Sequence, residues 1–135
     1  MKVLSYGDIT DGGSSVFTSV SKIDNTRLIV TFGGAIRIDN PYKHLESYLN
    51  DLEACLKKQR IESVELDFQE LSFCNSNGFY IIMDITETII NQSKGPIVVK
   101  RLKDDDWQQE TLPILLNVDE PEIGERTTFE EYPGL

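Results

Sequence analysis

The sequence predicts a single α/β domain over residues 1–135, built on a mixed β-sheet of four to five strands with helices packed mainly on one face. Strand-like alternation and helix-like periodicity take turns along the chain, which is the pattern of a layered α/β fold. Val64, Leu66 and Phe68 alternate with polar residues, which indicates one packed and one wetter sheet face. A length of 135 residues is enough to bury a core without disulfides or metals.

The first part of the chain is expected to form strands. Residues 1–15 hold a candidate extra strand at 3–6 and a turn at 11–15 that is rich in Gly and Ser. Residues 16–23 and 27–38 are predicted to be two strands, joined at 24–26 by a polar connection suited to a hairpin. Gly33 and Gly34 interrupt the second strand, which indicates a bulge or a close backbone approach.

A helix and a strand follow. Asp39, Asn40 and Pro41 form a typical helix start, because Asp or Asn caps the first turn and Pro fits inside it. The helix is expected to run to about residue 60, with one apolar stripe at spacings of three and four. The stripe consists of Tyr42, Leu45, Leu49, Leu52 and Leu56. Residues 61–68 are the next predicted strand.

The C-terminal half is expected to alternate helices and strands. A helix is predicted from about 78 to 93, where Gly95 and Pro96 stop it, and a short strand follows at 97–99. Three aspartates at 104–106 precede a helix at about 107–116, where acids suit the positive end of the helix dipole. A last strand is predicted within 123–129, and residues 130–135 form a polar tail.

The composition of the chain limits the kinds of partner, location and cofactor that we expect. The formal net charge is −10, which disfavours nucleic acid and anionic membrane as partners. The acidic surface either attracts a basic patch on a protein partner or only keeps the domain soluble. No apolar run approaches the roughly 18–20 residues of a membrane span, and the start of the chain has no signal-like segment. We therefore expect a cytoplasmic protein. Cys55 and Cys74 lack the spacing of a metal site or a disulfide framework, so free thiols and no cofactor are expected.

The function depends on the stretch Ser72 to Tyr80, SFCNSNGFY, and on whether Ser76 in it has a chemical role. Its polar centre, residues 75–78, is called the Ser76 motif below. Ser76 does not lie in a G-x-S-x-G elbow, and the single histidine of the chain is far upstream, so no base is at hand for a serine nucleophile. No phosphate-binding loop, dinucleotide fingerprint or metal-ligand cluster occurs. The sequence therefore indicates no catalytic residues and no enzyme.

Two interpretations of the Ser76 motif remain. Asn75 or Ser76 caps the following helix, because their side-chain oxygens accept from free N–H groups of the first turn. Alternatively, Ser76 is a phosphorylation site beside a docking surface, since residues 79–83 are apolar on more faces than one sheet contact covers. A phosphate at a helix start is tolerated by the helix dipole and adds about −1.5 to −2 charges.

The segment VELDFQELSFCNSNGFYIIMDI, residues 64–85, resembles the central segment of the STAS domain family, named for sulfate transporters and anti-sigma-factor antagonists. In that family a strand leads to a D-S-S-G motif and then to an apolar helix. Ser76 matches the phosphorylated serine and Gly78 the glycine, whereas Asn75 replaces the acid and Asn77 the second serine. Residues 106–109, DWQQ, are similar to a bacterial subgroup of stand-alone STAS regulators.

The resemblance implies a STAS-like fold over most of residues 16–129 and a role in signal transduction by partner switching. The partners that it implies are a serine kinase, which is an ATP-binding protein like an anti-sigma factor, and a serine phosphatase. An adaptor or structural subunit that is never phosphorylated is the alternative, and a homodimer stays open. The expected partner-binding residues are Asn75, Ser76, Asn77, Gly78, Phe79, Ile82, Gly33 and Gly34.

Overall fold

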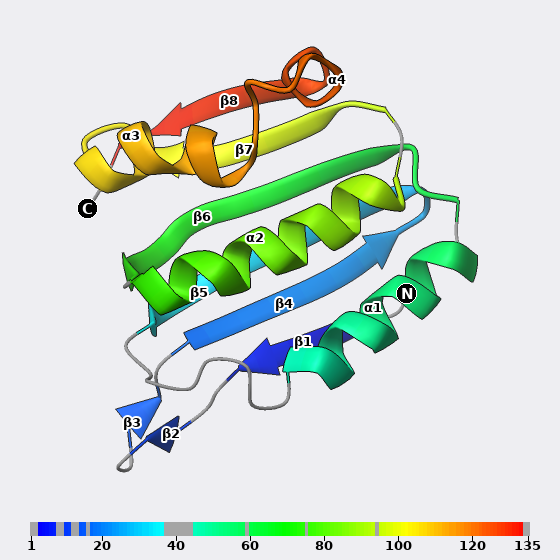
Figure 1. Cartoon of the computed structure of the whole chain (residues 1–135), viewed down its shortest axis with the longest axis horizontal. Helices are drawn as coiled ribbons and strands as arrows, with labels where there is room; N and C mark the ends of the chain where they lie inside the picture. Colours follow the sequence, from blue (N-terminus) through cyan, green and yellow to red (C-terminus); the bar gives the residue numbers. More distant parts are fainter. Residues whose placement is uncertain are drawn as a thin grey trace.

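The computed structural model of the chain describes residues 3–7, 10–11, 14–15, 17–36, 45–58, 60–74, 76–93 and 95–133. This part of the chain forms a six-stranded sheet in the order β1-β4-β5-β6-β7-β8 and a separate two-stranded sheet, β2-β3. Helices α1, α2 and α3 lie on one side of the large sheet (Figure 1). The predicted mixed sheet with helices on one face is confirmed, and β1 is the extra N-terminal strand.

The N-terminal strands are antiparallel. They are β1 (Val3–Gly7), β2 (Thr10–Asp11), β3 (Ser14–Ser15), β4 (Phe17–Asp24) and β5 (Arg27–Ile36). Asn25 has φ of 58° in the turn between β4 and β5, a conformation that Asn tolerates better than most residues. The register of β5 against β6 shifts between Thr31 and Gly33 and again between Gly34 and Ala35, so the predicted irregularity at these glycines is confirmed.

The rest of the chain adds parallel strands through helical crossovers. After β5 come α1 (Leu45–Lys58), β6 (Ser63–Cys74), α2 (Ser76–Asn91), β7 (Ile97–Leu102), α3 (Asp106–Leu115), α4 (Pro121–Gly124) and β8 (Thr127–Tyr132). β6 pairs in parallel with β5 and β7, and β7 pairs in parallel with β8. The carboxyl ends of these four strands therefore lie at the same edge of the sheet.

Several predicted boundaries were wrong. β6 continues to Cys74 instead of ending at residue 68, because pairing with β5 extends to the Ile36–Cys74 pair. Helix α2 begins at Ser76 rather than near residue 78. Pro121 starts the short helix α4 where a strand was expected, since Pro suits the first helical turn. Strand β8 then includes part of the predicted tail. The predicted cap at residues 39–41 lies outside the described residues.

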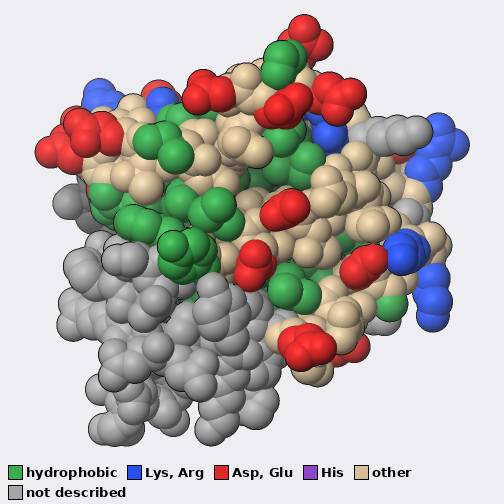
Figure 2. Space-filling view, in the orientation of Figure 1, with side chains coloured by type: hydrophobic (Ala, Val, Ile, Leu, Met, Phe, Trp, Pro, Cys, Tyr) green, Lys and Arg blue, Asp and Glu red, His purple; other side chains and the backbone are tan. Residues whose placement is uncertain are grey.

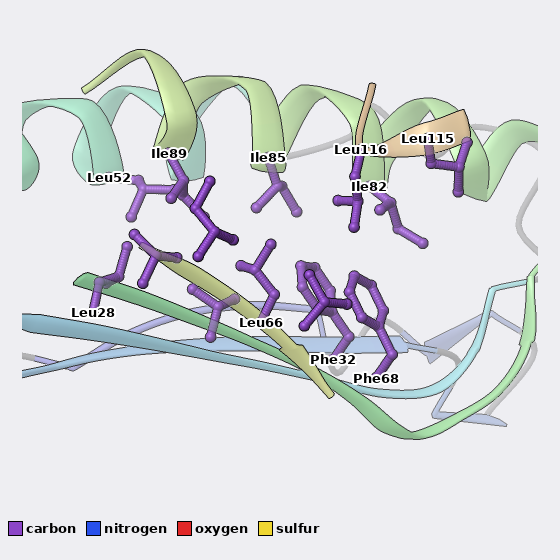
Figure 3. Close-up of a cluster of buried hydrophobic side chains, with 14 of the residues drawn as sticks. Leu28, Phe32, Leu52, Leu66, Phe68, Ile82, Ile85, Ile89, Leu115 and Leu116 are labelled. Carbon is purple, nitrogen blue, oxygen red and sulfur yellow. The ribbon is translucent and has the colours of Figure 1, made fainter. Parts of the chain in front are cut away.

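The core lies between the helices and the sheet. Figure 3 shows Leu28, Phe32, Leu66 and Phe68 pointing from the sheet toward the helices, and the rings of Phe32 and Phe68 stack with centroids 4.6 Å apart. Each of these side chains is fully buried, which stabilises the domain by roughly 1.5–3 kcal/mol per large apolar side chain. Positions 64, 66 and 68 of β6 therefore face the core, as the alternation predicted, whereas further along the strand Glu70 is exposed and Leu71 is buried.

The other sheet face carries charge instead of a helix. Glu65 is only 7% exposed there, because Arg27 and Lys100 flank its carboxylate on the neighbouring strands. Lys100 Nζ lies 3.4 Å from Glu65 Oε1. Partial burial lowers the pKa of Lys100, but attraction to the Glu65 carboxylate outweighs it, and the net pKa is raised. On this face Glu65 is thus satisfied by ion pairs, and Asp67 accepts hydrogen bonds from Gln69 on the same strand.

Candidate functional site

Ser76 occupies the first position of α2, at the carboxyl end of β6. The last residue of β6 is Cys74, so Asn75 alone separates strand from helix. The N–H groups of a first helical turn lack partners within the helix and carry the positive end of the dipole. The backbone at Ser76 is therefore suited to an anion, as a phosphorylated serine requires. Asn75 itself and the side chains of residues 72–78 lie outside the described part.

The carboxyl end of β6 is held by a buried glutamine of α3. Strands β6 and β7 pair only as far as Asp67 and Lys100, so the carbonyl groups beyond that point need other donors. Gln108 Nε2 donates to the carbonyl oxygens of Phe68, at 2.9 Å, and Leu71, at 3.2 Å. Gln108 Oε1 accepts from Leu102 N on β7 at 2.7 Å. This side chain bridges the two diverging strands just before the Ser76 motif.

Phe79 and Trp107 join α2 to the start of α3. Their ring centroids are 6.2 Å apart with an interplanar angle of 28°, and both residues are half-buried against the core. Asp105 caps α3 by accepting from Gln108 N at 3.4 Å, which agrees with the predicted role of acids there. Phe79, an expected contact residue, is therefore partly occupied by packing between the two helices, and only its remaining surface is open to a partner.

The exposed apolar surface lies beside Phe79. Tyr80 is 54% exposed and Met83 is 38% exposed, and the two are three residues apart on α2. Ile114, near the end of α3, is 70% exposed. Figure 2 shows hydrophobic side chains gathered on this face, between the first half of α2 and α3. Because large apolar side chains gather here at the surface, this face is a candidate for contact with another protein.

The remaining predicted contact residues are placed differently. Ile82 is fully buried and points into the core (Figure 3), so its assignment to a partner surface was wrong. Helix α2 is apolar nearly all round at its start, and the sheet takes the face that carries Ile82. Gly33 is buried, whereas Gly34 is exposed with φ of 83°. Gly34 pairs with Leu71, three residues before β6 ends, which places it near the same sheet edge as Ser76.

A carboxylate with a perturbed pKa lies on the same helix. Burial raises the pKa of Asp84, and repulsion from Glu87, three residues along, adds to the increase. Among the described residues, no group of three or more His, Cys, Asp or Glu side chains could hold a metal ion. None of the helices in the described ranges is long and apolar enough to cross a membrane. The described part of the site thus offers backbone donors and apolar surface.

Comparisons with known proteins give a likeness of fold. No protein-family model matches the chain, and no curated protein matches it significantly. Among solved structures, the anti-sigma factor antagonist SpoIIAA in its unphosphorylated form matches with a TM-score of 0.45 and 10% sequence identity. The match covers 83% of this chain and 87% of that chain.

Sequence reasoning missed Gln108 and the surface residues Tyr80, Met83 and Ile114. Gln108 follows Trp107 in a stretch that was assigned to a helix, and no local pattern marks a glutamine that bonds another strand's backbone. Tyr80 and Met83 lie in an apolar run of residues 79–83, and only the packed helix reveals which members face the sheet. The run itself was the available signal, because it contains more apolar faces than one contact can cover.

Proposed function

We propose that the chain is a regulatory protein-interaction domain of the anti-sigma-factor-antagonist type, which exchanges partners when Ser76 is phosphorylated. The phosphate donor is a serine kinase of the ATP-binding, anti-sigma-like kind, and a serine phosphatase resets the cycle. Such an exchange takes place in the bacterial cytoplasm, where ATP is available. The domain acts as substrate and adaptor and does not itself catalyse a reaction.

The observation that carries this proposal is the position of Ser76 at the first residue of α2, directly after β6. A phosphate there meets free N–H groups and the positive end of the helix dipole, so the domain keeps its fold after modification. Tyr80 lies one helical turn further along and is 54% exposed. A partner that covers Tyr80 therefore approaches within a few ångströms of the modified residue.

The phosphate supports switching through desolvation. A partner seated on Tyr80 and Met83 has to remove water from about −1.5 to −2 added charges at the edge of its footprint. Driving a complex from almost fully bound to almost fully free takes about 5.5 kcal/mol of differential affinity. A phosphate in the interface contributes a large part of this differential affinity. The net charge of −10 on the domain adds repulsion where the partner surface is also acidic.

An adaptor that is never phosphorylated is the second candidate. The asparagines at positions 75 and 77 favour it, since they leave one hydroxyl in the motif and no carboxylate before it. The apolar face formed by Tyr80, Met83 and Ile114 serves an adaptor equally well, because its contacts do not require a phosphate. The two candidates differ in one measurable property, which is whether charge at Ser76 changes the affinity for the partner.

The test is to incubate the purified domain with ATP and the serine kinase encoded beside its gene, and to map the product by mass spectrometry. We expect one phosphate, on Ser76, and none on the S76A variant. The domain with phosphoserine incorporated at position 76 should then bind the unmodified partner about 5- to 150-fold more weakly. Isothermal titration calorimetry measures the difference.

A matched control separates this effect from added charge in general. Ser63 begins β6 at the opposite edge of the sheet and is half-exposed, so phosphoserine at position 63 adds the same charge away from the motif. We expect it to change the affinity less than twofold at physiological salt, where charges about 8 Å or more apart are screened. An unmodified Ser76 after kinase treatment, or equal binding of both phosphorylated forms, would contradict the phosphorylation switch. The adaptor that is never phosphorylated would then be the remaining candidate function.

A further inference from the structure

A groove lies between α2 and the segment that contains the end of α3 and α4. Met83, Glu87 and Ile90 line its α2 side at spacings of four and three, so they share one face of the helix. Ile114 and Ile123 line the opposite side, and the enclosed volume is about 220 Å³. We call this the apolar groove. It begins seven residues along α2 from Ser76, roughly 10 Å away.

Two apolar side chains that line the apolar groove are exposed. Ile114 is 70% exposed and Met83 is 38% exposed. Neighbouring Leu115 and Leu116 face inward and are nearly buried, so the helix end is anchored without Ile114. An isoleucine presented to water opposite a methionine across a groove is typical of a surface that receives apolar side chains of another molecule.

The apolar groove continues into an acidic hollow. The two share Ile90, Asn91 and Ile123, and the hollow encloses about 600 Å³. Its carboxylates come from α4 and its flanks, and Figure 2 shows acidic side chains gathered around this helix. They are Glu120, Glu122 and Glu125. Among the described residues, none of these three takes part in a salt bridge.

The one cation that lines the acidic hollow is already bound to backbone, as far as the described residues show. Arg126 Nε donates to the carbonyl oxygen of Gly95 at 2.8 Å, and its Nη2 donates to that of Ser93 at 3.3 Å. The guanidinium therefore holds the loop before β7 and does not pair with the glutamates in a salt bridge. The hollow thus keeps unneutralised negative charge beside an apolar groove.

We propose that the apolar groove and the acidic hollow together bind an amphipathic helix with a basic end, on a surface that shares Met83 and Ile114 with the exposed apolar face of α2 and α3. Apolar side chains at spacings of three and four fill the groove between Met83 and Ile114, and Lys or Arg side chains at one end pair with the glutamates of α4. The net charge of −10 on each copy disfavours a second copy as the occupant and favours a partner with basic residues. The same charge repels nucleic acid and anionic lipid.

A peptide selection tests this surface with the whole domain. The probe is a displayed library of helical 14-residue peptides, about 21 Å long, with Leu fixed along one face and the other positions random. We expect selected peptides to carry Lys or Arg near one end. Their affinity, measured by fluorescence anisotropy, should fall about tenfold or more in the I114D variant and also in a variant with Glu120, Glu122 and Glu125 changed to Gln.

Two controls make the outcome decisive. V20D places the same charge on exposed apolar surface of β4, and E46Q removes a carboxylate from the exposed face of α1, so each should change peptide affinity less than about twofold. Thermal unfolding checks that I114D keeps the fold, and I114S repeats the test without added charge. Selected peptides without basic residues, or equal binding to the wild type and both Ile114 variants, would overturn the proposal. Because neither a kinase nor a phosphate enters this measurement, its failure can be distinguished from a failure of the phosphorylation switch.

Discussion

The hydroxyl of Tyr48 shows how single residues link the helical layer to the sheet. It lies 2.6 Å from the hydroxyl of Ser21 and 3.3 Å from that of Ser19, both buried on β4. Burial raises the pKa of Tyr48, and the two serine hydrogen bonds oppose that increase. Tyr48 was not among the residues that sequence periodicity assigned to the apolar stripe, yet it packs in the core because its polar tip finds partners there.

Removing that hydroxyl should weaken the domain. Y48F keeps the ring but leaves two buried serines without their partner, so we expect the free energy of unfolding to fall by about 1 kcal/mol. Urea denaturation followed by circular dichroism measures the change. Y80F serves as the control, because the hydroxyl that it removes belongs to an exposed residue. Coincident unfolding curves for Y48F and the wild type would show that these hydrogen bonds add nothing.

At the scale of elements, the divergence of β6 from β7 governs where α2 begins. Pairing between them ends at Asp67 and Lys100, while β6 runs on to Cys74 alongside β5. Gln108 fills the opening with three hydrogen bonds, two to β6 and one to β7. It is therefore a positioning residue for the Ser76 motif, because it fixes the strand end from which the helix starts.

Replacing Gln108 by Leu should loosen that strand end. Q108L keeps the volume but leaves two carbonyl groups and one N–H without partners, so we expect a loss of at least about 2 kcal/mol in the free energy of unfolding. Amide hydrogen exchange should also speed up over residues 71–80 more than over α1. E110Q, on the exposed face of α3, is the control. Uniform acceleration across the whole domain would contradict a local positioning role.

Local patterns predicted most elements of this fold but not the contacts made between them. The β4–β5 hairpin, α3 and the alternation of β6 follow from residues close in the chain, and all three are confirmed. The last six residues of β6 do not, because two consecutive polar residues, Gln69 and Glu70, interrupt the alternation and the strand is held there by pairing with β5. Ile82 was misassigned for a similar reason: where nearly every position is apolar, only packing decides which faces the core.

The sequence predicted where the Ser76 motif lies in the chain, but not which other residues form the surface beside it. Residues 75–78 follow a predicted strand in the sequence, and in the fold residues 76–78 form the start of α2 directly after β6, so the motif could be located directly. The surface that accompanies it combines α2 with α3, which are brought together by tertiary packing of Phe79 against Trp107. No residue spacing in the sequence predicts this contact between the two helices. For the same reason, the apolar groove between α2 and the segment with the end of α3 and α4 could not be predicted.

Across the whole molecule, two carboxylates respond to acid in opposite ways. Partial burial opposes ionisation of Glu131, but hydrogen bonds from Gln109 and Arg101 outweigh it and lower its pKa, so its contribution to stability is lost as pH falls through the folded pKa. The pKa of Asp84 is raised by burial and by Glu87. Its ionisation therefore costs stability at neutral pH, and that cost disappears as pH falls through the folded pKa.

The Asp84 effect can be isolated by substitution. D84N removes a charge that the folded state disfavours, so we expect a small gain in the free energy of unfolding at pH 7 and low salt. The gain should shrink with added salt and vanish at about pH 3, where the carboxyl is neutral in both states. D119N removes an equal charge from an exposed position and is the control. An identical gain in both variants would assign the effect to net charge alone.

The contact between Phe79 and Trp107 makes Trp107 an intrinsic fluorescent probe of the start of α2. Trp107 is the single tryptophan in the chain, and its ring stacks on the residue that comes three positions after Ser76. Its indole nitrogen is buried and has no hydrogen-bond partner among the described residues. Selective excitation of this one fluorophore therefore reports on the start of α2 with no dye attached. We expect the proposed phosphate transfer and partner binding to change its emission, so that both can be followed in real time.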